Sequence, residues 1–289
     1  LAFISNYFLK INMSSDSWRW MLGVEAIPAF IFFGLVFLIP KSPRWLVFRK
    51  RYEESFVILK ALGEANPEER LQTIKGSFEQ KKEQEKLFQR KYLKPLILVF
   101  LMATFNQFSG INAIMYYAPR IFEAAGITKD SAFLQAASVG FVNMLFTIGA
   151  MVLIDKVGRR KLMIIGSVGM ILSLLATTYL LNNRELGVSF LIVPVLFFIA
   201  SFAFSQGAVI WVFISEVFPN KVRAAGQSFG TFIHWCWAAA LTWLFPVVAG
   251  LANGITYAFG FFALTMILQL IFAIKFFPET KGKSLEEDI

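Results

Sequence analysis

The side chains with the clearest chemical potential in this sequence are uncharged hydrogen-bonding groups inside long apolar segments. Amides both donate and accept hydrogen bonds, as hydroxyl groups do, and aromatic faces suit the apolar face of a sugar ring. A cavity lined in this way favours a neutral solute with many hydroxyl groups, because a charged solute would call for an opposite charge. The residues are Asn106, Gln107, Asn112, Asn143, Gln206, His234, Gln269, Tyr116, Tyr117, Trp211 and Trp235.

A purely structural role for these residues is the alternative. Polar side chains in membrane helices often bond a neighbouring helix, and tryptophan often anchors a helix at the interface, as expected for Trp18, Trp20 and Trp45. On a straight helix Gln107 and Asn112 would lie about 140° apart, too far to reach one ligand. A helix break at Ser109-Gly110 would bring them together. Composition alone leaves both roles open.

Composition places the chain among membrane proteins. The 289 residues are 57% hydrophobic and only 16% charged, whereas a soluble domain has about 25% charged residues. With one cysteine and one histidine, the chain cannot form an internal disulfide or a Cys/His zinc cluster, so no metal or cofactor is expected. No cluster of acids, bases or metal ligands lies at depth, and therefore an enzyme is not expected.

Long uncharged segments give the number of spans. A bilayer core takes about 20 helical residues, so each of four segments predicts one span and the fifth predicts two, with a turn over Ala249–Gly254. Residues 20–40 predict a seventh span, with Glu25 near its start. The fold class is thus an all-α polytopic membrane protein. The uncharged segments are 95–119, 131–154, 162–183, 186–215 and 224–274.

Basic residues predict the orientation. Twenty-three lysines and arginines lie in the connections 41–94, 155–161 and 216–223 and at the C-terminal end, against five in the alternate connections. Because cytoplasmic loops carry the excess of basic residues, these connections and the C-terminus are expected to be cytoplasmic. The net charge of +9 is then explained by topology and by attraction to membrane lipid, and no nucleic-acid partner is expected.

Residues 41–94 are polar and predict short amphipathic helices on the cytoplasmic face, with a partner-binding surface as the alternative. One helix is expected over Tyr52–Leu62, stopped by Gly63, and another from Pro67, with Leu71, Ile74 and Phe78 as its apolar stripe. At the other end of the chain, Leu1–Leu9 is typical of the end of an apolar helix. We therefore expect a fragment of a longer protein.

The segment Asn106–Tyr117, NQFSGINAIMYY, resembles the QQ-x-SGxN-xxx-YY motif of the sugar porter family of the major facilitator superfamily. Asn106 replaces the first glutamine of that motif. Four further segments resemble motifs of the same family in the same order, namely Lys41–Leu46, Asp155–Arg160, Ser215–Pro219 with Arg223, and Pro278–Gly282.

The resemblance implies the major facilitator superfamily fold, from the end of helix five through helix twelve. Residues 1–40 would be the end of helix five and helix six, 41–94 an intracellular helical domain, 95–277 the six-helix C-terminal half, and 278–289 a cytoplasmic tail. The rest of the N-terminal half, missing from this sequence, would be its partner.

The resemblance also implies residue roles. Gln107, Asn112 and Asn143 would bind sugar hydroxyls, with Asn106 and Tyr116 as further contacts; Trp211 and Trp235 would stack on the sugar, and the backbone of Gly207 would approach it. Gly207–Ile210 lacks the family's proline, so a weaker helix break is expected there. Tyr116 and Tyr117 would form an extracellular gate. Arg44, Asp155, Arg159, Glu216 and Arg223 would form a cytoplasmic latch.

The function implied is transport of a monosaccharide by alternating access, without a chemical reaction, in the plasma (inner) membrane. Proton symport, with the proton as a second partner, and facilitated diffusion are both compatible with this sequence. A non-transporting sugar sensor and a carrier for a related polyol are the alternatives. For His234, which precedes Trp235, a neutral hydrogen-bonding role is expected rather than a proton-linked one.

Overall fold

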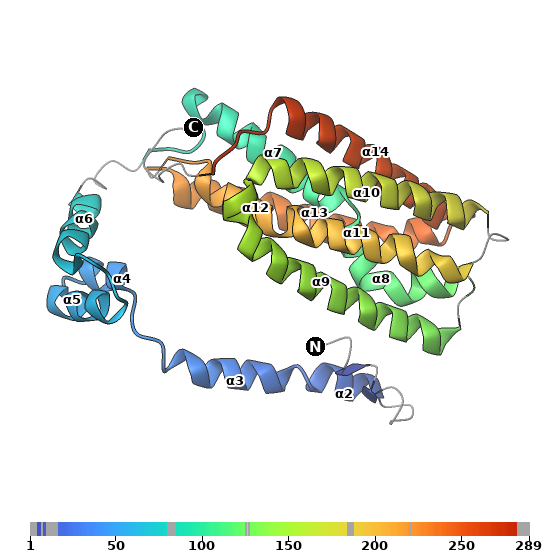
Figure 1. The fold of residues 1–289 in the computed structure, drawn as a ribbon, viewed down its shortest axis with the longest axis horizontal. Helices are drawn as coiled ribbons and strands as arrows, with labels where there is room; N and C mark the ends of the chain where they lie inside the picture. Colours follow the sequence, from blue (N-terminus) through green and yellow to red (C-terminus); the bar gives the residue numbers. More distant parts are fainter. Residues whose placement is uncertain are drawn as a thin grey trace. The chain divides into compact units, whose positions relative to one another are not determined.

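The computed structural model describes residues 5–6, 8–9, 17–79, 85–124, 126, 128–183, 188–219 and 221–281. The chain divides into a first unit that ends at Glu85 and a second that begins at Lys86. Across the described residues, seven helical segments are long and apolar enough to cross a membrane, as the sequence predicts. Figure 1 shows the chain without strands in its described part.

The first unit begins with one membrane-length segment, made of α2 (Ser17–Gly23) and α3 (Ala26–Val36) with a turn at Val24-Glu25. None of the described side chains of these two helices is buried within the unit. A segment with apolar side chains all round is typical of a helix that other apolar surfaces cover, as lipid does for a membrane span.

Three short helices complete the first unit: α4 (Pro43–Phe48), α5 (Tyr52–Ala61) and α6 (Pro67–Glu79). They share a small core of Val47, Leu59, Leu71 and Ile74. The two predicted helices are confirmed: α5 ends one residue before Leu62, ahead of Gly63 with φ +77°, and α6 starts at Pro67. The Phe78 side chain of the predicted stripe lies outside the described residues.

The described part of the second unit contains six spans, two of which are interrupted. Among its described residues the elements are η2 (Arg90–Tyr92), α7 (Leu93–Phe108), α8 (Ile111–Ala124), α9 (Lys129–Val157), α10 (Arg159–Asn182), η4 (Val188–Leu191), α11 (Ile192–Phe204), α12 (Gln206–Glu216), α13 (Arg223–Ala249) and α14 (Gly254–Lys275). The predicted turn between the last two helices is confirmed; Asn253 adopts the left-handed conformation, with φ +57°.

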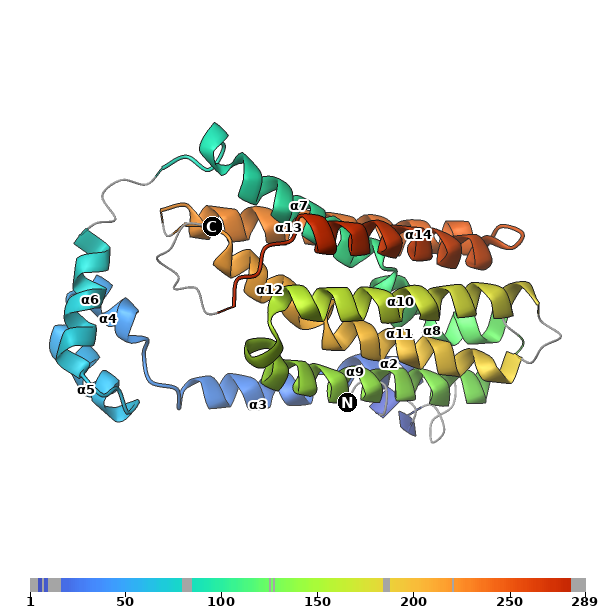
Figure 2. The same cartoon turned by 45° about the horizontal axis from the view of Figure 1, so that its top comes forward.

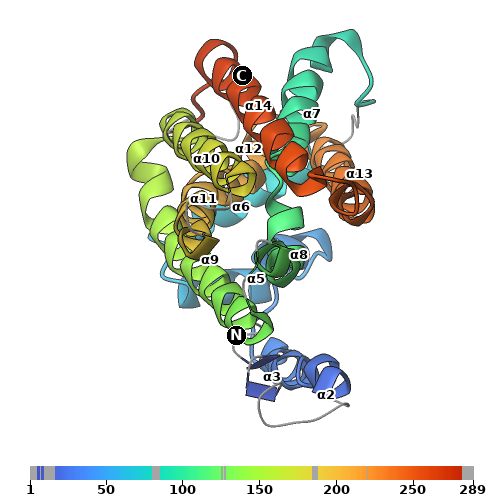
Figure 3. The same ribbon diagram turned by 90° about the vertical axis from the view of Figure 1, so that its right-hand side faces the viewer.

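The helices of the second unit pack lengthwise as a bundle. α10 packs against α11 and α14, and α9 packs against α11, as Figure 2 shows. On the other side, α13 packs against α7, and the two helices lie next to each other in Figure 3. The Trp237 indole supports this contact by donating a hydrogen bond to Thr104 Oγ1 at 3.0 Å. The bundle therefore sets α7, α8, α12 and α13 close enough to build a shared site.

Candidate functional site

Side-chain hydrogen bonds satisfy several backbone groups at the interruption between α7 and α8. Gly110 has φ +86°, a conformation that favours glycine, and a Cβ atom there would lie 2.3 Å from the Phe262 ring. Ser109 Oγ donates to the Asn106 carbonyl at 2.7 Å and accepts from the Ile111 N–H at 3.3 Å. Thr265 Oγ1 donates to the Phe108 carbonyl at 2.7 Å, which satisfies a group that the helix end leaves free. The predicted break at Ser109-Gly110 is confirmed.

This break brings Gln107 and Asn112 together. Asn112 Nδ2 donates to Gln107 Oε1 at 2.8 Å, although the two residues would point in different directions on a straight helix. Gln107 is only 1% exposed, and its Nε2 lies 3.0 Å from Nε2 of His234 on α13. We call Gln107, Asn112 and His234 the amide–imidazole cluster. It joins both halves of the interrupted helix to α13.

Two indoles flank this cluster. The His234 ring lies 4.9 Å from the Trp211 ring of α12 and 5.3 Å from the Trp235 ring, centroid to centroid. Trp211 is 44% exposed and Trp235 56%, so both side chains are partly accessible in the bundle. The arrangement offers neutral donors and acceptors beside apolar ring faces, the combination that recognises a hydroxylated ring.

His234 was not among the sugar ligands predicted from the sequence, yet it lies at the centre of the site. Gln107 Nε2 lies 3.0 Å from Nε2 and 3.3 Å from Nδ1 of the imidazole, and an amide nitrogen can only donate to such a partner. This geometry supports a hydrogen-bonding histidine. The signal in the sequence was its position next to Trp235, but nothing local indicated a contact with Gln107, 127 residues away.

The remaining predicted ligands lie around the cluster with fewer contacts. Asn106 is buried, and its Oδ1 accepts from Gln107 Nε2 at 3.4 Å. Asn143 on α9 is half-buried; its carbonyl accepts from Thr147, and no hydrogen bond joins its side chain to the amide–imidazole cluster within the described residues. Gly207 lies one helical turn before Trp211 on α12 and therefore on the same face.

The second interrupted span breaks at Ser205, between α11 and α12, with φ −118° and ψ −91°. The sequence predicted only a weak break here because Gly207–Ile210 contains no proline. The interruption forms without a proline, and Ser205 Oγ donates to the Ser201 carbonyl at 2.6 Å beside it.

Gln206 and Gln269 have the structural role. Both are fully buried, and Gln206 Nε2 donates to Gln269 Oε1 at 2.5 Å. Gln269 Nε2 donates in turn to Ser167 Oγ at 2.8 Å. These amides join α12, α14 and α10, as polar residues commonly do between membrane helices. The structure thus separates them from the amides of the amide–imidazole cluster.

The predicted gate tyrosines differ in their environment. Tyr116 is exposed, whereas Tyr117 is half-buried and its hydroxyl donates to the Thr242 carbonyl at 3.0 Å. Pro246 lies four residues after Thr242 and has no N–H, so this carbonyl lacks its helical partner. A cavity of about 240 Å³ opens beside Tyr117 and does not reach Gln107; it is lined by Tyr117, Arg120, Ile121, Phe245, Pro246, Ala249, Gly250 and Ile255.

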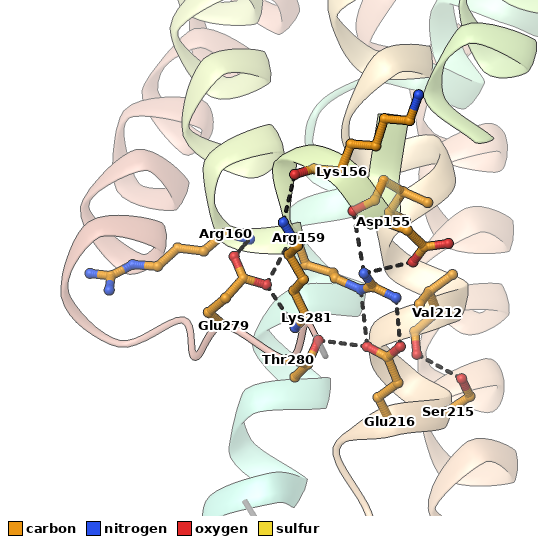
Figure 4. A network of polar contacts seen from close by, with 11 residues as sticks. Asp155, Lys156, Arg159, Arg160, Val212, Ser215, Glu216, Glu279, Thr280 and Lys281 are labelled. Atoms are coloured by element: carbon orange, nitrogen blue, oxygen red, sulfur yellow. Dashed lines mark hydrogen bonds and ion pairs between the residues drawn. The ribbon is translucent and has the colours of Figure 1, made fainter. Parts of the chain in front are cut away.

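At the other end of the bundle, a charged network joins three helices and the C-terminal segment (Figure 4). The Arg159 guanidinium contacts Asp155 Oδ1 at 2.9 Å and Glu216 Oε1 at 2.8 Å. Thr280 Oγ1 donates to the same Glu216 carboxylate at 2.5 Å. Three of the five predicted latch residues are therefore in contact. Of the others, Arg223 donates to the Phe218 carbonyl at 3.0 Å, and Arg44 belongs to the first unit.

The C-terminal segment also caps two helices in this network. Glu279 accepts hydrogen bonds from the N–H groups of Arg159 at 2.9 Å and Arg160 at 3.1 Å, at the start of α10. A carboxylate at this position is stabilised by the helix dipole. Lys281 Nζ donates to the Lys156 carbonyl at 2.6 Å, near the end of α9. Pro278–Gly282 resembles the family motif that ends the last helix, but this resemblance did not predict the capping contacts.

Among the described residues, no group of three or more His, Cys, Asp or Glu side chains is arranged to hold a metal ion. The site is built from neutral side chains, and the charges lie at the bundle end. This arrangement can bind a polar solute by hydrogen bonds and stacking.

Known proteins share this sequence pattern and fold. The sequence profile described as "Sugar (and other) transporter" matches residues 1–288. The D-xylose-proton symporter of Escherichia coli (strain K12) is 34% identical over 300 residues, which cover 99% of this chain and 60% of that protein. The arabinose-proton symporter of Bacillus subtilis (strain 168) is 39% identical over 300 residues, 99% of this chain and 64% of that protein.

A solved structure of a relative has the same fold as this chain. The structure of the proton:xylose symporter XylE bound to 6-bromo-6-deoxy-D-glucose aligns with a TM-score of 0.83 at 33% identity, covering 99% of this chain and 62% of that one. The chain thus spans about three fifths of the length of the relatives that it matches.

Proposed function

We propose that this chain, which belongs to the sugar transporter family, forms the larger part of a membrane carrier that moves a monosaccharide by alternating access. The observation that carries the proposal is the amide–imidazole cluster, whose His234 ring contacts the partly exposed indoles Trp211 and Trp235. Relatives are named for proton symport of xylose or arabinose and for facilitated diffusion of glucose, so a pentose or hexose, with or without a coupled proton, is the proposed cargo.

The cluster suits a carrier because its internal hydrogen bonds are neutral and replaceable. A sugar hydroxyl can take the place of Asn112 on Gln107 and return a donor and an acceptor of its own. Since one such exchange changes the free energy by only about 1 kcal/mol, the solute is held without being trapped. Trp211 and Trp235 would then supply most of the apolar contact, by stacking on the ring. Asn143, Asn106, Tyr116 and the Gly207 backbone are proposed as the surrounding contacts.

Alternating access requires a device at each end of the bundle. We assign Tyr116 and Tyr117 to an extracellular gate, since they lie on α8 beyond the amide–imidazole cluster. We assign Arg44, Asp155, Arg159, Glu216 and Arg223 to a cytoplasmic latch, with the C-terminus on the same side. The contacts of Arg159 with Asp155 and Glu216 support this second assignment. Two states that differ by a few kcal/mol can be biased by such a small network.

The test is uptake of radiolabelled xylose, arabinose and glucose by proteoliposomes that hold the carrier containing this chain. Replacing Trp211 by leucine removes a stacking face worth about 1 kcal/mol, so sugar affinity should fall about five- to tenfold. Trp243→Leu is the matched control, because Trp243 is also an exposed indole of the bundle but has no contact with His234. Equal loss in both variants, or no uptake of any monosaccharide by the unaltered carrier, would contradict the proposal.

A further inference from the structure

The segment that directly follows the first membrane-length helix is strongly basic. Residues 41–51 contain five basic side chains and no acidic one, and α3 ends only a few residues earlier, at Val36. Basic residues at the end of a membrane span lie at the depth of the lipid head groups, where each contributes to binding of anionic lipid. The five are Lys41, Arg44, Arg49, Lys50 and Arg51.

The helix α4 within this segment has one side fixed inside its unit. Leu46 is fully buried, and Val47 packs into the core with Leu59. Ser55 Oγ donates to the Pro43 carbonyl at 3.1 Å and so ties the start of α4 to α5. Because these contacts fix the orientation of the short helix, the side chains on its other side are presented outward together.

The outward side carries one indole between two cations. Lys41 Nζ lies 5.7 Å from the Trp45 ring centroid and the Arg49 guanidinium carbon 5.6 Å, from positions four residues before and after it. Trp45 is 41% exposed. Within the described part of the chain, neither Lys41 nor Arg49 forms an ion pair, whereas Arg51 pairs with Glu54 at 2.5 Å. The two cations over Trp45 thus remain available to an anion.

We propose that Lys41, Trp45 and Arg49 form a binding site for the phosphate of an anionic phospholipid, such as phosphatidylglycerol. The two cations bind the phosphate oxygens, and the indole occupies the interface, where tryptophan is favoured. The charge and the position of the site indicate its ligand. Two cations lie beside an indole, and the segment directly follows a membrane-length helix. At this position the neighbouring anion is lipid phosphate. This site goes beyond the proposed transport function and shares no residue with the sugar site or the latch.

The experiment compares two doubly substituted carriers in which the same charge is lost. Lys41→Gln/Arg49→Gln removes both cations over Trp45. Lys60→Gln/Lys75→Gln is the control, because it removes two charges from the same unit, and Lys75 lies 4.1 Å from the Tyr52 ring in a contact of the same kind. Each carrier is placed in nanodiscs of phosphatidylcholine with or without phosphatidylglycerol. The readouts are hydrogen exchange of the 41–51 amides and the number of phosphatidylglycerol molecules retained in native mass spectra.

Phosphatidylglycerol should slow exchange in 41–51 for the unaltered carrier and for the Lys60/Lys75 control. Loss of the two cations should weaken its binding about 30-fold, since each basic residue near a membrane contributes about a factor of five. Two results would overturn the site: equal protection in phosphatidylcholine alone, which would mean that protein or any lipid covers the segment, or equal loss of binding in both doubly substituted carriers, which would mean a diffuse effect of charge.

Discussion

Gln107 and His234 lie 3.0 Å apart, amide nitrogen to imidazole nitrogen, and this one contact ties the interrupted α7–α8 span to α13. Both side chains are buried, so neither can exchange its partner for bulk water. A buried donor that loses its acceptor is penalised by about 1–3 kcal/mol. The pair is therefore expected to be important for stability as well as for binding.

Replacing His234 by leucine removes the acceptor and should lower sugar uptake about tenfold or more, with a loss of about 1–3 kcal/mol in unfolding free energy. His234→Gln keeps an acceptor at a similar reach and should retain most of both. Proteoliposome uptake and thermal unfolding measure the two effects. If the leucine and glutamine variants show the same uptake and the same unfolding free energy, the contact between Gln107 and His234 contributes to neither binding nor stability.

Gly110→Ala should destabilise the chain, because its φ of +86° is unfavourable for alanine and the new Cβ would lie 2.3 Å from the Phe262 ring. We expect a loss of about 1–3 kcal/mol or more, together with misplacement of Asn112. Gly149→Ala is the control: no atom lies within 4 Å of its added Cβ, and alanine favours the helix. Thermal unfolding of the two variants should move in opposite directions, and a stable Gly110→Ala chain would refute the strain argument.

Local signals explain why much of the fold could be predicted from the sequence. The five uncharged segments predicted six spans and residues 20–40 the seventh, and Ser109-Gly110 predicted the break that unites Gln107 with Asn112, because these features depend on neighbours in the chain. A weaker break was expected near Ser205 because the segment has no proline, yet the helix is interrupted there without one.

The parts of the site that could not be predicted depend on contacts between distant segments. His234 could not be placed next to Gln107 from spacing. Composition did not distinguish the structural amides Gln206 and Gln269 from the amides of the site; only the resemblance to the family motif assigned roles to Gln107, Asn112 and Asn143. All these residues are uncharged groups at membrane depth, and only the packing of the helices decides which of them meet.

Tyr117 and Pro246 should be coupled. Tyr117→Phe removes the hydroxyl that satisfies the Thr242 carbonyl and should reduce stability by about 1 kcal/mol. In a Pro246→Ala background, the new backbone N–H can bond that carbonyl, so the loss from Tyr117→Phe should shrink. A double-mutant cycle by thermal unfolding measures the coupling. Additive effects would show that the hydroxyl does not substitute for the missing N–H.

Glu279 should stabilise the start of α10. Glu279→Ala removes the acceptor for the N–H groups of Arg159 and Arg160, with an expected loss of about 1–2 kcal/mol. Glu279→Gln keeps only one of the two acceptor oxygens and loses the charge, so its loss of stability should lie between zero and that of Glu279→Ala. Thermal unfolding, combined with hydrogen exchange of the first turn of α10, measures both. An unchanged exchange rate in Glu279→Ala would contradict the capping role.

The two acidic partners of Arg159 differ in exposure, and this difference tests the proposed latch. The Glu216 side chain is 19% exposed and is also bonded to Thr280, whereas the Asp155 side chain is 77% exposed. Exposed ion pairs contribute only about 0–1 kcal/mol because water screens them. Most of the electrostatic stabilisation of Arg159 should therefore come from Glu216.

Glu216→Gln should consequently shift the carrier toward its inward-facing state, while Asp155→Asn should leave the distribution nearly unchanged. The shift can be measured as faster labelling of a cysteine introduced in the proposed cytoplasmic connection near Lys221, in a Cys236→Ser background that removes the native thiol. A change of about 1.4 kcal/mol between states would appear as a tenfold change in their ratio. Equal labelling in both variants would contradict the latch. It would mean that the Arg159 network only stabilises the second unit, in which both of these ion pairs lie.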